Sequence, residues 1–162
     1  MAYSLRPFHP SDADNLIELR RLAIEQIGIS AYSKDQVEAW ASKVGNAQGL
    51  LARFENGDLI TVACDTADRA IGYSLLGPGG HLDHLYCHPE HTGQGLADKL
   101  LAQSELIARQ NGARQLHTEA SVLARPAFLR AGYIETERRD FEIEFGGRKV
   151  PIHNFAMVKQ IG

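Results

Sequence analysis

A glycine-rich turn in the middle of the chain has residue types suited to holding an anion. It reads Thr92-Gly93-Gln94-Gly95-Leu96-Ala97 and lies between a strand-like run and a long helical pattern. The first turn of a helix exposes unpaired backbone N–H groups and carries a partial positive charge, so it accepts phosphate oxygens. Glycines at 93 and 95 let the backbone come close to that anion. The turn therefore predicts a ligand that contains phosphate.

A Gly-x-Gly pair by itself is a weak signal, because many turns use glycine for structural reasons alone. This turn lacks the Gly-Lys-Ser/Thr ending of a P-loop, and it follows a predicted hairpin instead of opening a first strand–helix–strand unit. Both features argue against the two common nucleotide-binding loops. A purely structural helix start stays open as the alternative.

The segments on either side predict the elements that hold the turn in place. Runs 59–64 and 70–76 are rich in β-forming residues and are separated by a short polar stretch, which predicts an antiparallel hairpin. Residues 81–87 predict a further strand, 93–110 a long amphipathic helix and 115–120 the next strand. The order strand, helix, strand implies that the strands on either side of the helix are parallel.

The two ends of the chain add further elements, predicted from apolar spacing and from the Gly146-Gly147 pair, which is typical of a hairpin. In chain order these are a strand at 4–8, helices at 16–27, 37–44 and 50–54, a short helix at 124–131, and strands at 133–145 and 148–158.

The composition fits one globular domain, residues 1–162, because 44% of the 162 residues are hydrophobic and 23% are charged. The formal net charge of -3, from 17 basic and 20 acidic residues, gives no basic excess of the kind that binds nucleic acid or an anionic membrane. Cys64 and Cys87 lie in apolar runs and are expected to be buried, reduced thiols. No signal-peptide pattern and no run of ~20 apolar residues is present, so we expect a cytoplasmic protein.

The turn and the strand before it resemble the GNAT superfamily of N-acetyltransferases. Its members carry a Gln/Arg-x-x-Gly-x-Gly/Ala motif between a strand and a long helix, and the strand often reads Ile-Glu-Asp-Leu-Tyr-Val-His-Pro-Glu. Here it reads Leu82-Asp83-His84-Leu85-Tyr86-Cys87-His88-Pro89-Glu90. The stretch 124–133 is similar to a later family pattern, and the order of elements agrees from Tyr3 to Lys159. The resemblance implies a GNAT-like α/β fold, with a mixed α+β sheet of about six to seven strands flanked by helices.

The resemblance implies an enzyme that moves an acetyl group from acetyl-CoA to a primary amine of a small molecule or a peptide by direct attack. Backbone groups of the preceding strand would pair with the pantetheine arm, and the amides from Gly93 to Ala97 would hold the pyrophosphate. Thr92 stands where the family has Gln or Arg, which removes a side-chain contact but no backbone amide. The implied cofactor-binding residues are Leu85, Tyr86, Cys87, Thr92, Gly93, Gln94, Gly95, Leu96, Ala97 and Phe128.

Asp83, Glu119 and Ser121 are the candidates for moving protons. An alkyl amine with a pKa near ~10.4 is almost wholly protonated at neutral pH, so a base must take its proton. Asp83 occupies the position where similar family members often place a glutamate base, and strand alternation puts it on the face of Leu85 and Cys87. Glu119 ends the neighbouring predicted strand, and the Ser121 hydroxyl could relay a proton. The structural alternatives are an ion pair for Asp83, a surface carboxylate for Glu119 and a helix cap for Ser121.

Phe128 departs from the family pattern, because many relatives supply a tyrosine as acid at this position. The sulfur of coenzyme A then leaves unaided, takes a proton from water, or takes one from another hydroxyl such as Tyr86, Tyr133 or Ser121. A thiol with a pKa near ~8.5 is a good leaving group without help. The departure also supports an alternative function, a non-catalytic module that binds acetyl-CoA.

Four histidines near the turn, His81, His84, His88 and His91, raise the question of a metal site with Asp83. On a strand His81 and His84 face opposite sides, so we expect no metal.

The predicted N-terminal helices carry Tyr32, Trp40 and Phe54 in the region that the family uses to wall the acceptor site. Trp40 has helical spacing to Val37 and Val44, which also fits packing in the core. The sequence names no acceptor, and it leaves a homodimer open.

Overall fold

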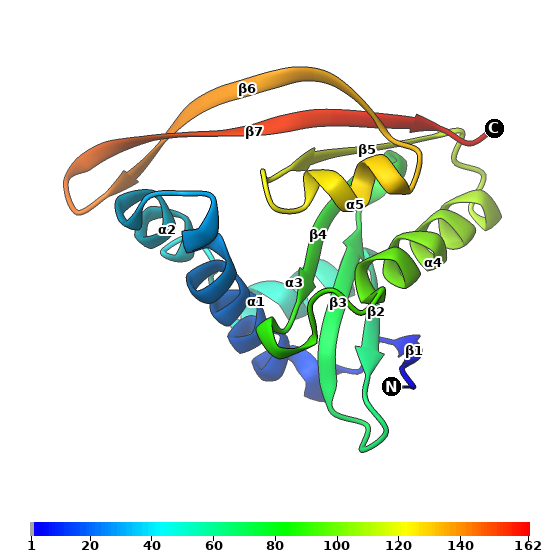
Figure 1. The fold of residues 1–162 in the computed structure, drawn as a ribbon. Coiled ribbons are helices and arrows are strands. Elements are labelled where there is room, and N and C mark those ends of the chain that lie inside the picture. The colour runs from blue at the N-terminus through cyan, green and yellow to red at the C-terminus, as the bar shows by residue number, and fades with distance from the viewer. Residues whose placement is uncertain (1) are drawn as a thin grey trace.

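The computed structural model of the chain describes residues 2–162, so Met1 lies outside the described residues. Within this range there are seven β-strands and five α-helices (Figure 1). In chain order they are β1 (Ser4–Pro7), α1 (Ala13–Ile27), α2 (Lys34–Ala41), α3 (Ala47–Glu55), β2 (Leu59–Cys64), β3 (Ala70–Leu76), β4 (Leu82–Cys87), α4 (Leu96–Gln110), β5 (Gln115–Ala120), α5 (Arg125–Arg130), β6 (Ile134–Phe145) and β7 (Arg148–Gln160). The predicted α/β fold with helices flanking the strands is confirmed.

The strands form two antiparallel sheets. The single sheet that the sequence predicts is divided between β4 and β5. One sheet has the strand order β1-β2-β3-β4 and the other β5-β7-β6. β4 and β5 are parallel, as predicted, but among the described residues they are joined by one bridge, between His81 and His117. The Thr118 hydroxyl adds a hydrogen bond to the Leu82 carbonyl oxygen at 2.7 Å. Beyond this point the two strands diverge (Figure 1), where β4 leads into the glycine-rich turn.

Helix α4 lies close against β3 because two positions of that strand carry small residues. A Cβ on Gly72 would lie 3.0 Å from the side chain of Leu96, and the hydroxyls of Ser74 and Ser104 are 3.0 Å apart. Leu96 and Leu100 are buried in this contact. The N-terminus of α4 is thereby held beside the end of β4.

Helices α1 and α3 cover the other face of the four-stranded sheet. Leu16 and Leu19 of α1 pack in one apolar cluster with Tyr73 and Leu75 of β3. The long hairpin of β6 and β7 reaches across the molecule to α2 (Figure 1). Helix α1, helix α2 and this hairpin thus surround the diverging ends of β4 and β5.

Each predicted helix differs from the observed one by a few residues at one end or both, and two of these differences have identifiable reasons. The helix expected at 93–110 begins at Leu96, because Gly93 and Gly95 have φ of 73° and 80°, in the left-handed region. The short helix expected at 50–54 extends over Ala47–Glu55, since the Asn46 side chain caps it by accepting a hydrogen bond from the Gly49 N–H at 2.9 Å.

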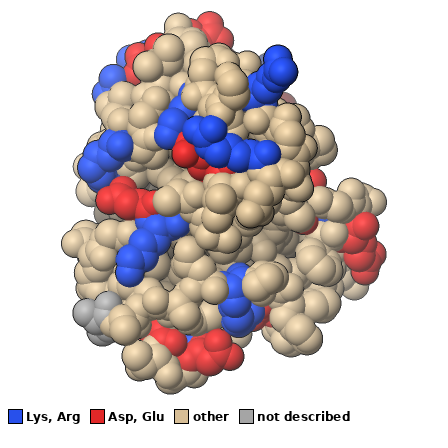
Figure 2. Space-filling model, turned by 90° about the vertical axis from the view of Figure 1, so that its right-hand side faces the viewer, with Lys and Arg blue, Asp and Glu red and all other residues tan. Residues whose placement is uncertain are grey.

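Charged side chains of both signs are interspersed on the face that includes α4 (Figure 2). Two carboxylates of α4 are paired there with cations from later elements, Asp98 with Arg130 at 3.1 Å and Glu105 with Lys159. No helix within residues 2–162 is both long enough and apolar enough to cross a membrane. Both cysteines are free; Cys64 is buried, whereas Cys87 is only half-buried.

Candidate active site

The glycine-rich turn presents the start of α4 to solvent. After β4 the chain makes a 3₁₀ turn at Pro89–His91, and the His88 ring accepts a hydrogen bond from the Glu90 N–H at 3.2 Å. Gly95 is the N-cap of α4 in the left-handed conformation, and no side chain caps the helix. Residues 92–95 are exposed. The first N–H groups of α4 are therefore available to an anion.

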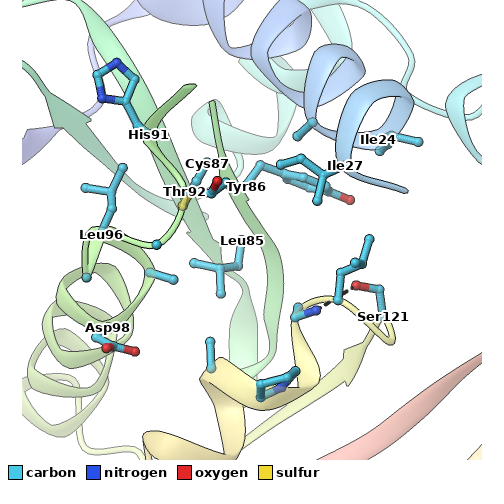
Figure 3. Close-up of a pocket in the computed structure, with 18 of the residues that line it drawn as sticks. Ile24, Ile27, Leu85, Tyr86, Cys87, His91, Thr92, Leu96, Asp98 and Ser121 are labelled. Carbon is cyan, nitrogen blue, oxygen red and sulfur yellow. Dashed lines mark hydrogen bonds between the residues drawn. The ribbon is translucent and has the colours of Figure 1, made fainter. Parts of the chain in front are cut away.

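A cavity of about 480 Å³ lies beside this turn (Figure 3), and we call it the donor cavity. Eight of the predicted cofactor-binding residues line it: Leu85, Tyr86, Cys87, Thr92, Gly93, Gly95, Leu96 and Ala97. Two do not. The side chain of Gln94 accepts a hydrogen bond from the Tyr3 hydroxyl, and Phe128 is buried with its ring edge-on to Tyr133.

The rest of the donor cavity comes from α1, α4 and α5. Ile24 and Ile27 of α1 form an apolar wall opposite Leu85 (Figure 3). Asp98 and Arg130, which form an ion pair, lie at the end near the start of α4. Sequence reasoning missed this pair and the α1 wall, because isoleucines at helical spacing are equally typical of a core-facing helix.

A second cavity of about 370 Å³ adjoins the first, and we call it the acceptor cavity. Its charged and aromatic lining comes from seven elements and their flanking turns: Arg20, Tyr32, Trp40, Lys43, Asp83, Tyr86, Glu119, Phe128, Arg139, Phe141 and His153. Five residues line both cavities: Trp40, Leu85, Tyr86, Ser121 and Ala124. The two cavities therefore meet at the point where β4 and β5 have diverged.

Asp83 and Glu119 come together in the acceptor cavity, with His81 between them. The Nε2 atom of His81 and Oε1 of Glu119 are 2.9 Å apart, and one ligand-type atom from each of the three residues lies within 4.8 Å of the others. Nη1 of Arg53, from α3, donates to Oδ2 of Asp83 at 2.5 Å. This spacing could suit a metal ion; in the structure Arg53 binds the Asp83 carboxylate and His81 contacts Glu119.

The histidine set considered from the sequence does not gather. His84 is buried, with Nδ1 3.0 Å from the Tyr73 hydroxyl, and burial lowers its pKa to about 3, so the ring is neutral at neutral pH. His88 is used in its own turn, and His91 lies against Tyr3.

A β-bulge changes the direction of the Asp83 side chain. Leu75 pairs with His84 and Leu76 with Leu82, which leaves Asp83 as the extra residue on β4. The expectation that Asp83 shares a face with Leu85 and Cys87 is therefore wrong: its carboxylate contacts α3, whereas Leu85 and Cys87 pack against Leu96 of α4.

The pKa of the Asp83 carboxyl lies below its usual range. Burial raises it, whereas the hydrogen bond and the positive charge of Arg53 lower it, and the net direction is downward. A carboxylate stabilised in this way is a weak base. Asp83 thus lines the acceptor cavity, as the proposed base should, and also forms the ion pair that was its structural alternative.

Ser121 and Tyr32 fasten the turn between β5 and α5. The Ser121 hydroxyl accepts a hydrogen bond from the Ala124 N–H at 3.1 Å, which closes the turn before α5 but does not cap that helix, whose N-cap is Ala124. Ser121 also lines both cavities. The Tyr32 hydroxyl accepts from the Val122 N–H at 2.9 Å and donates to the His153 carbonyl oxygen at 3.0 Å. Ser121 is thus held at the junction of the cavities.

Of the remaining candidate residues, some line a cavity and others are packed in the core. Trp40 lines both cavities and stands edge-on to Tyr32, whereas Phe54 packs against Phe8 in the core and lines neither cavity. The Tyr133 hydroxyl is buried away from both. Burial raises the pKa of the Cys87 thiol to about 12, so it stays protonated and unreactive.

Comparison with known proteins gives concordant matches. A family model described as an acetyltransferase (GNAT) domain matches residues 29–147. The spermidine N(1)-acetyltransferase of Thermoplasma acidophilum is 24% identical over 119 residues, which cover 69% of this chain and 74% of that protein.

Two solved structures have the same fold. A GCN5-related N-acetyltransferase from Rhodopseudomonas palustris, also described as a class-II aminotransferase, superposes with a TM-score of 0.87 at 30% identity, over 99% of this chain and 97% of that one. The PaiA N-acetyltransferase of Thermoplasma acidophilum, in complex with coenzyme A, superposes with a TM-score of 0.78 at 21% identity, over 99% and 100% of the two chains.

Proposed function

The chain belongs to the GNAT acetyltransferase family, and from that premise we propose that it moves the acetyl group of acetyl-CoA to a primary amine of a small molecule or a peptide by direct attack. The observation that carries this proposal is the meeting of the two cavities at Leu85, Tyr86 and Ser121. One cavity begins at an uncapped helix N-terminus, and the other contains two carboxylates. A thioester on one side and an amine on the other would face each other at this junction.

The donor cavity fits coenzyme A by its chemistry. The N–H groups from Gly93 to Ala97 would hold the pyrophosphate at the start of α4, and Arg130 would add a cation beside it. The apolar side chains of Leu85 and Ile24 suit the pantetheine arm. Bound acetyl-CoA would supply the thioester whose acetyl carbon is transferred. Coenzyme A in the PaiA structure supports this assignment.

We assign Glu119 as the base that takes the proton of the amine. Asp83 is the weaker base of the two because Arg53 stabilises its charge, and we assign it to hold the ammonium group by a hydrogen bond. His81 touches Glu119 at 2.9 Å and can pass the proton on to solvent. The Ser121 hydroxyl relays between the amine and Glu119.

Position 128 supplies no acid, since Phe128 has no hydroxyl and is 2% exposed. We assign the proton of the leaving sulfur to Tyr86, whose side chain belongs to the lining of both cavities. A backbone N–H near Leu85 or Tyr86 would stabilise the charge that develops on the acetyl oxygen.

We also propose that residues 1–162 work as a single domain in the cytoplasm. Leu85 and Tyr86 each pack against two of the apolar clusters, which makes the core continuous. The two free cysteines suit a reducing compartment.

The test is release of free thiol from acetyl-CoA in the presence of a panel of primary amines, with mass detection of the acetylated product. The proposal expects thiol release that depends on at least one amine. Tight binding of acetyl-CoA without release for any amine would favour the non-catalytic module and overturn the proposal.

A further inference from the structure

The charges that line the acceptor cavity are unevenly paired. Its two carboxylates already have partners, because Asp83 binds Arg53 at 2.5 Å and Glu119 binds His81 at 2.9 Å. Its three cations come from α1, from the turn after α2 and from β6, and they are Arg20, Lys43 and Arg139. Within residues 2–162, none of these three has a carboxylate oxygen within 4.0 Å, whereas most arginines of the chain do.

Arg20 is the most constrained of the three cations. Its guanidinium lies over the Tyr86 ring, 5.3 Å from the ring centre, and Nη1 donates to the Val44 carbonyl oxygen at 3.1 Å. Its Nε atom is buried and has no hydrogen-bond partner among the described residues. Buried polar atoms almost always have a partner, and an unpaired buried charge is destabilising. The described residues therefore satisfy only part of this guanidinium, which lines the acceptor cavity and can offer its other donors to a ligand with acceptor oxygens.

We propose that the acceptor is an amine that also bears a carboxylate, such as an amino acid, and that Arg20 binds this carboxylate. The inference rests on the proposed function and specifies its substrate class. The amino group would face Glu119 and Asp83, while the guanidinium of Arg20 offers the planar donors that match a carboxylate. Lys43 and Arg139, both exposed, add positive potential at the same cavity.

The same charges disfavour a polyamine. A molecule with several ammonium groups would bring like charge against three cations that lack a carboxylate partner among the described residues, and the lining has only two carboxylates to offset that charge. Spermidine, which names the similar enzyme of Thermoplasma acidophilum, is such a molecule. The two substrate classes are therefore separable by experiment.

The experiment compares matched pairs of amines, each pair an α-amino acid and its decarboxylated amine, with spermidine added as a polyamine. Values of kcat/KM are expressed per neutral amine, so that different amine pKa values do not bias the comparison. The wild-type protein is expected to prefer the carboxylate-bearing member by about 10- to 100-fold, as a charged hydrogen bond would give.

Arg20→Gln is expected to remove that preference by raising KM for the amino acid far more than KM for the decarboxylated amine. Any effect through the Tyr86 ring under Arg20 would fall on both amines equally and leave their ratio unchanged. Arg21→Gln is the matched control, since Arg21 is the next residue of α1 and lines neither cavity; the preference should survive. The double variant Lys43→Gln/Arg139→Gln changes two exposed residues and should reduce the preference several-fold without unfolding the chain.

Three results would overturn the inference. A wild-type preference for the decarboxylated amines or for spermidine would overturn it while leaving the proposed function intact. A preference that persists in both Arg20→Gln and the double variant would show that other groups bind the acceptor. Failure to acetylate any amine would remove the proposed function and this inference together.

Discussion

The donor cavity and the acceptor cavity are assembled from the chain in different ways. Half of the donor-cavity lining comes from the stretch 85–98, and α1, α2, α5 and the turn before α5 supply the rest. The acceptor cavity collects side chains from α1 through to β7. Backbone conformation defines the first: two glycines with positive φ and a helix start. Pairing between side chains that are distant in sequence defines the second, as in the Arg53–Asp83 contact.

This difference predicts which cavity keeps its chemistry when side chains are substituted and which does not. Backbone N–H groups are present whatever the side chains are, so a phosphate site at a helix start persists through most substitutions. An acceptor cavity built from Arg20, Glu119 and Arg139 changes its chemistry with each single substitution. We therefore expect substitutions at the donor cavity to act through backbone geometry, and those at the acceptor cavity to act through individual side chains.

The largest effect is expected from Gly95→Glu. Gly95 has φ of 80°, which costs other residues about 1–2 kcal/mol, and the new carboxylate would repel the pyrophosphate. The dissociation constant of acetyl-CoA, measured by calorimetry, should rise by at least about 100-fold.

Gly112→Glu controls for the strain, because Gly112 follows the other end of α4 with φ of 81° and, like Gly95, has no atom within 4 Å of an added Cβ. The two variants should lose similar stability, but only Gly95→Glu should lose binding. If both variants bound acetyl-CoA equally well, the start of α4 would not be the phosphate site.

The donor side could be predicted because its determinants are contiguous in sequence. The strand, the turn and the helix start appear as one uninterrupted pattern from Leu82 to Ala97, and eight of the ten predicted cofactor residues line the donor cavity. The two that do not, Gln94 and Phe128, depend on side-chain direction, which the pattern does not specify. The order of elements could be predicted for the same reason, but not the division of the sheet at the His81–His117 bridge.

The next effect in size is expected from the two carboxylates of the acceptor cavity. Glu119→Gln should lower kcat/KM by about 100-fold, the lower end of what a general base contributes, and Asp83→Asn by about 10-fold because Arg53 makes it the weaker base. Both losses should be greatest below neutral pH, where the amine is hardest to deprotonate. Glu142→Gln, on exposed β6 and outside both cavities, should leave the pH–rate profile unchanged. Parental profiles for both cavity variants would show that neither carboxylate is the base.

A smaller effect, on the pH dependence, is expected from Arg53→Gln. Burial raises the pKa of Asp83 and the Arg53 hydrogen bond lowers it, so removing the guanidinium should raise that pKa. Asp83 would then be protonated at higher pH, and the acid limb of kcat/KM should move to higher pH. In an Asp83→Asn background the same substitution should cause no such shift. A shift that persists there would assign the titration to another group.

The acceptor side could be predicted only in part, for physical reasons. Asp83 and Glu119 are noticeable as carboxylates near strand ends, but one bulge changed the direction of Asp83 and brought it to Arg53. His81 was considered only as a metal ligand, and its contact with Glu119 depends on where β4 and β5 separate. Arg20 and Arg139 carry no local signal, because an arginine on a helix or an exposed strand is ordinary until folding leaves it without a partner.

The smallest effect is expected from Tyr32→Phe, which removes one hydroxyl from the wall of the acceptor cavity. That hydroxyl joins the Val122 N–H to the His153 carbonyl oxygen, and burial raises its pKa, so it stays protonated and able to donate. Its loss leaves two backbone groups unpaired and should lower the free energy of unfolding by about 1–2 kcal/mol. Because the β5–α5 turn and β7 would separate slightly, the KM for the acceptor should rise a few-fold, while the dissociation constant of acetyl-CoA stays the same.

Tyr133→Phe is the matched control for this variant. The Tyr133 hydroxyl is also buried, but among residues 2–162 it has no hydrogen-bond partner, so its removal should leave stability unchanged or slightly raise it. Chemical denaturation and acceptor KM, measured side by side, separate the two hydroxyls. If both substitutions changed stability equally, or if Tyr32→Phe weakened acetyl-CoA as much as the acceptor, the Tyr32 link would belong to the core as a whole and the two cavities would not respond independently.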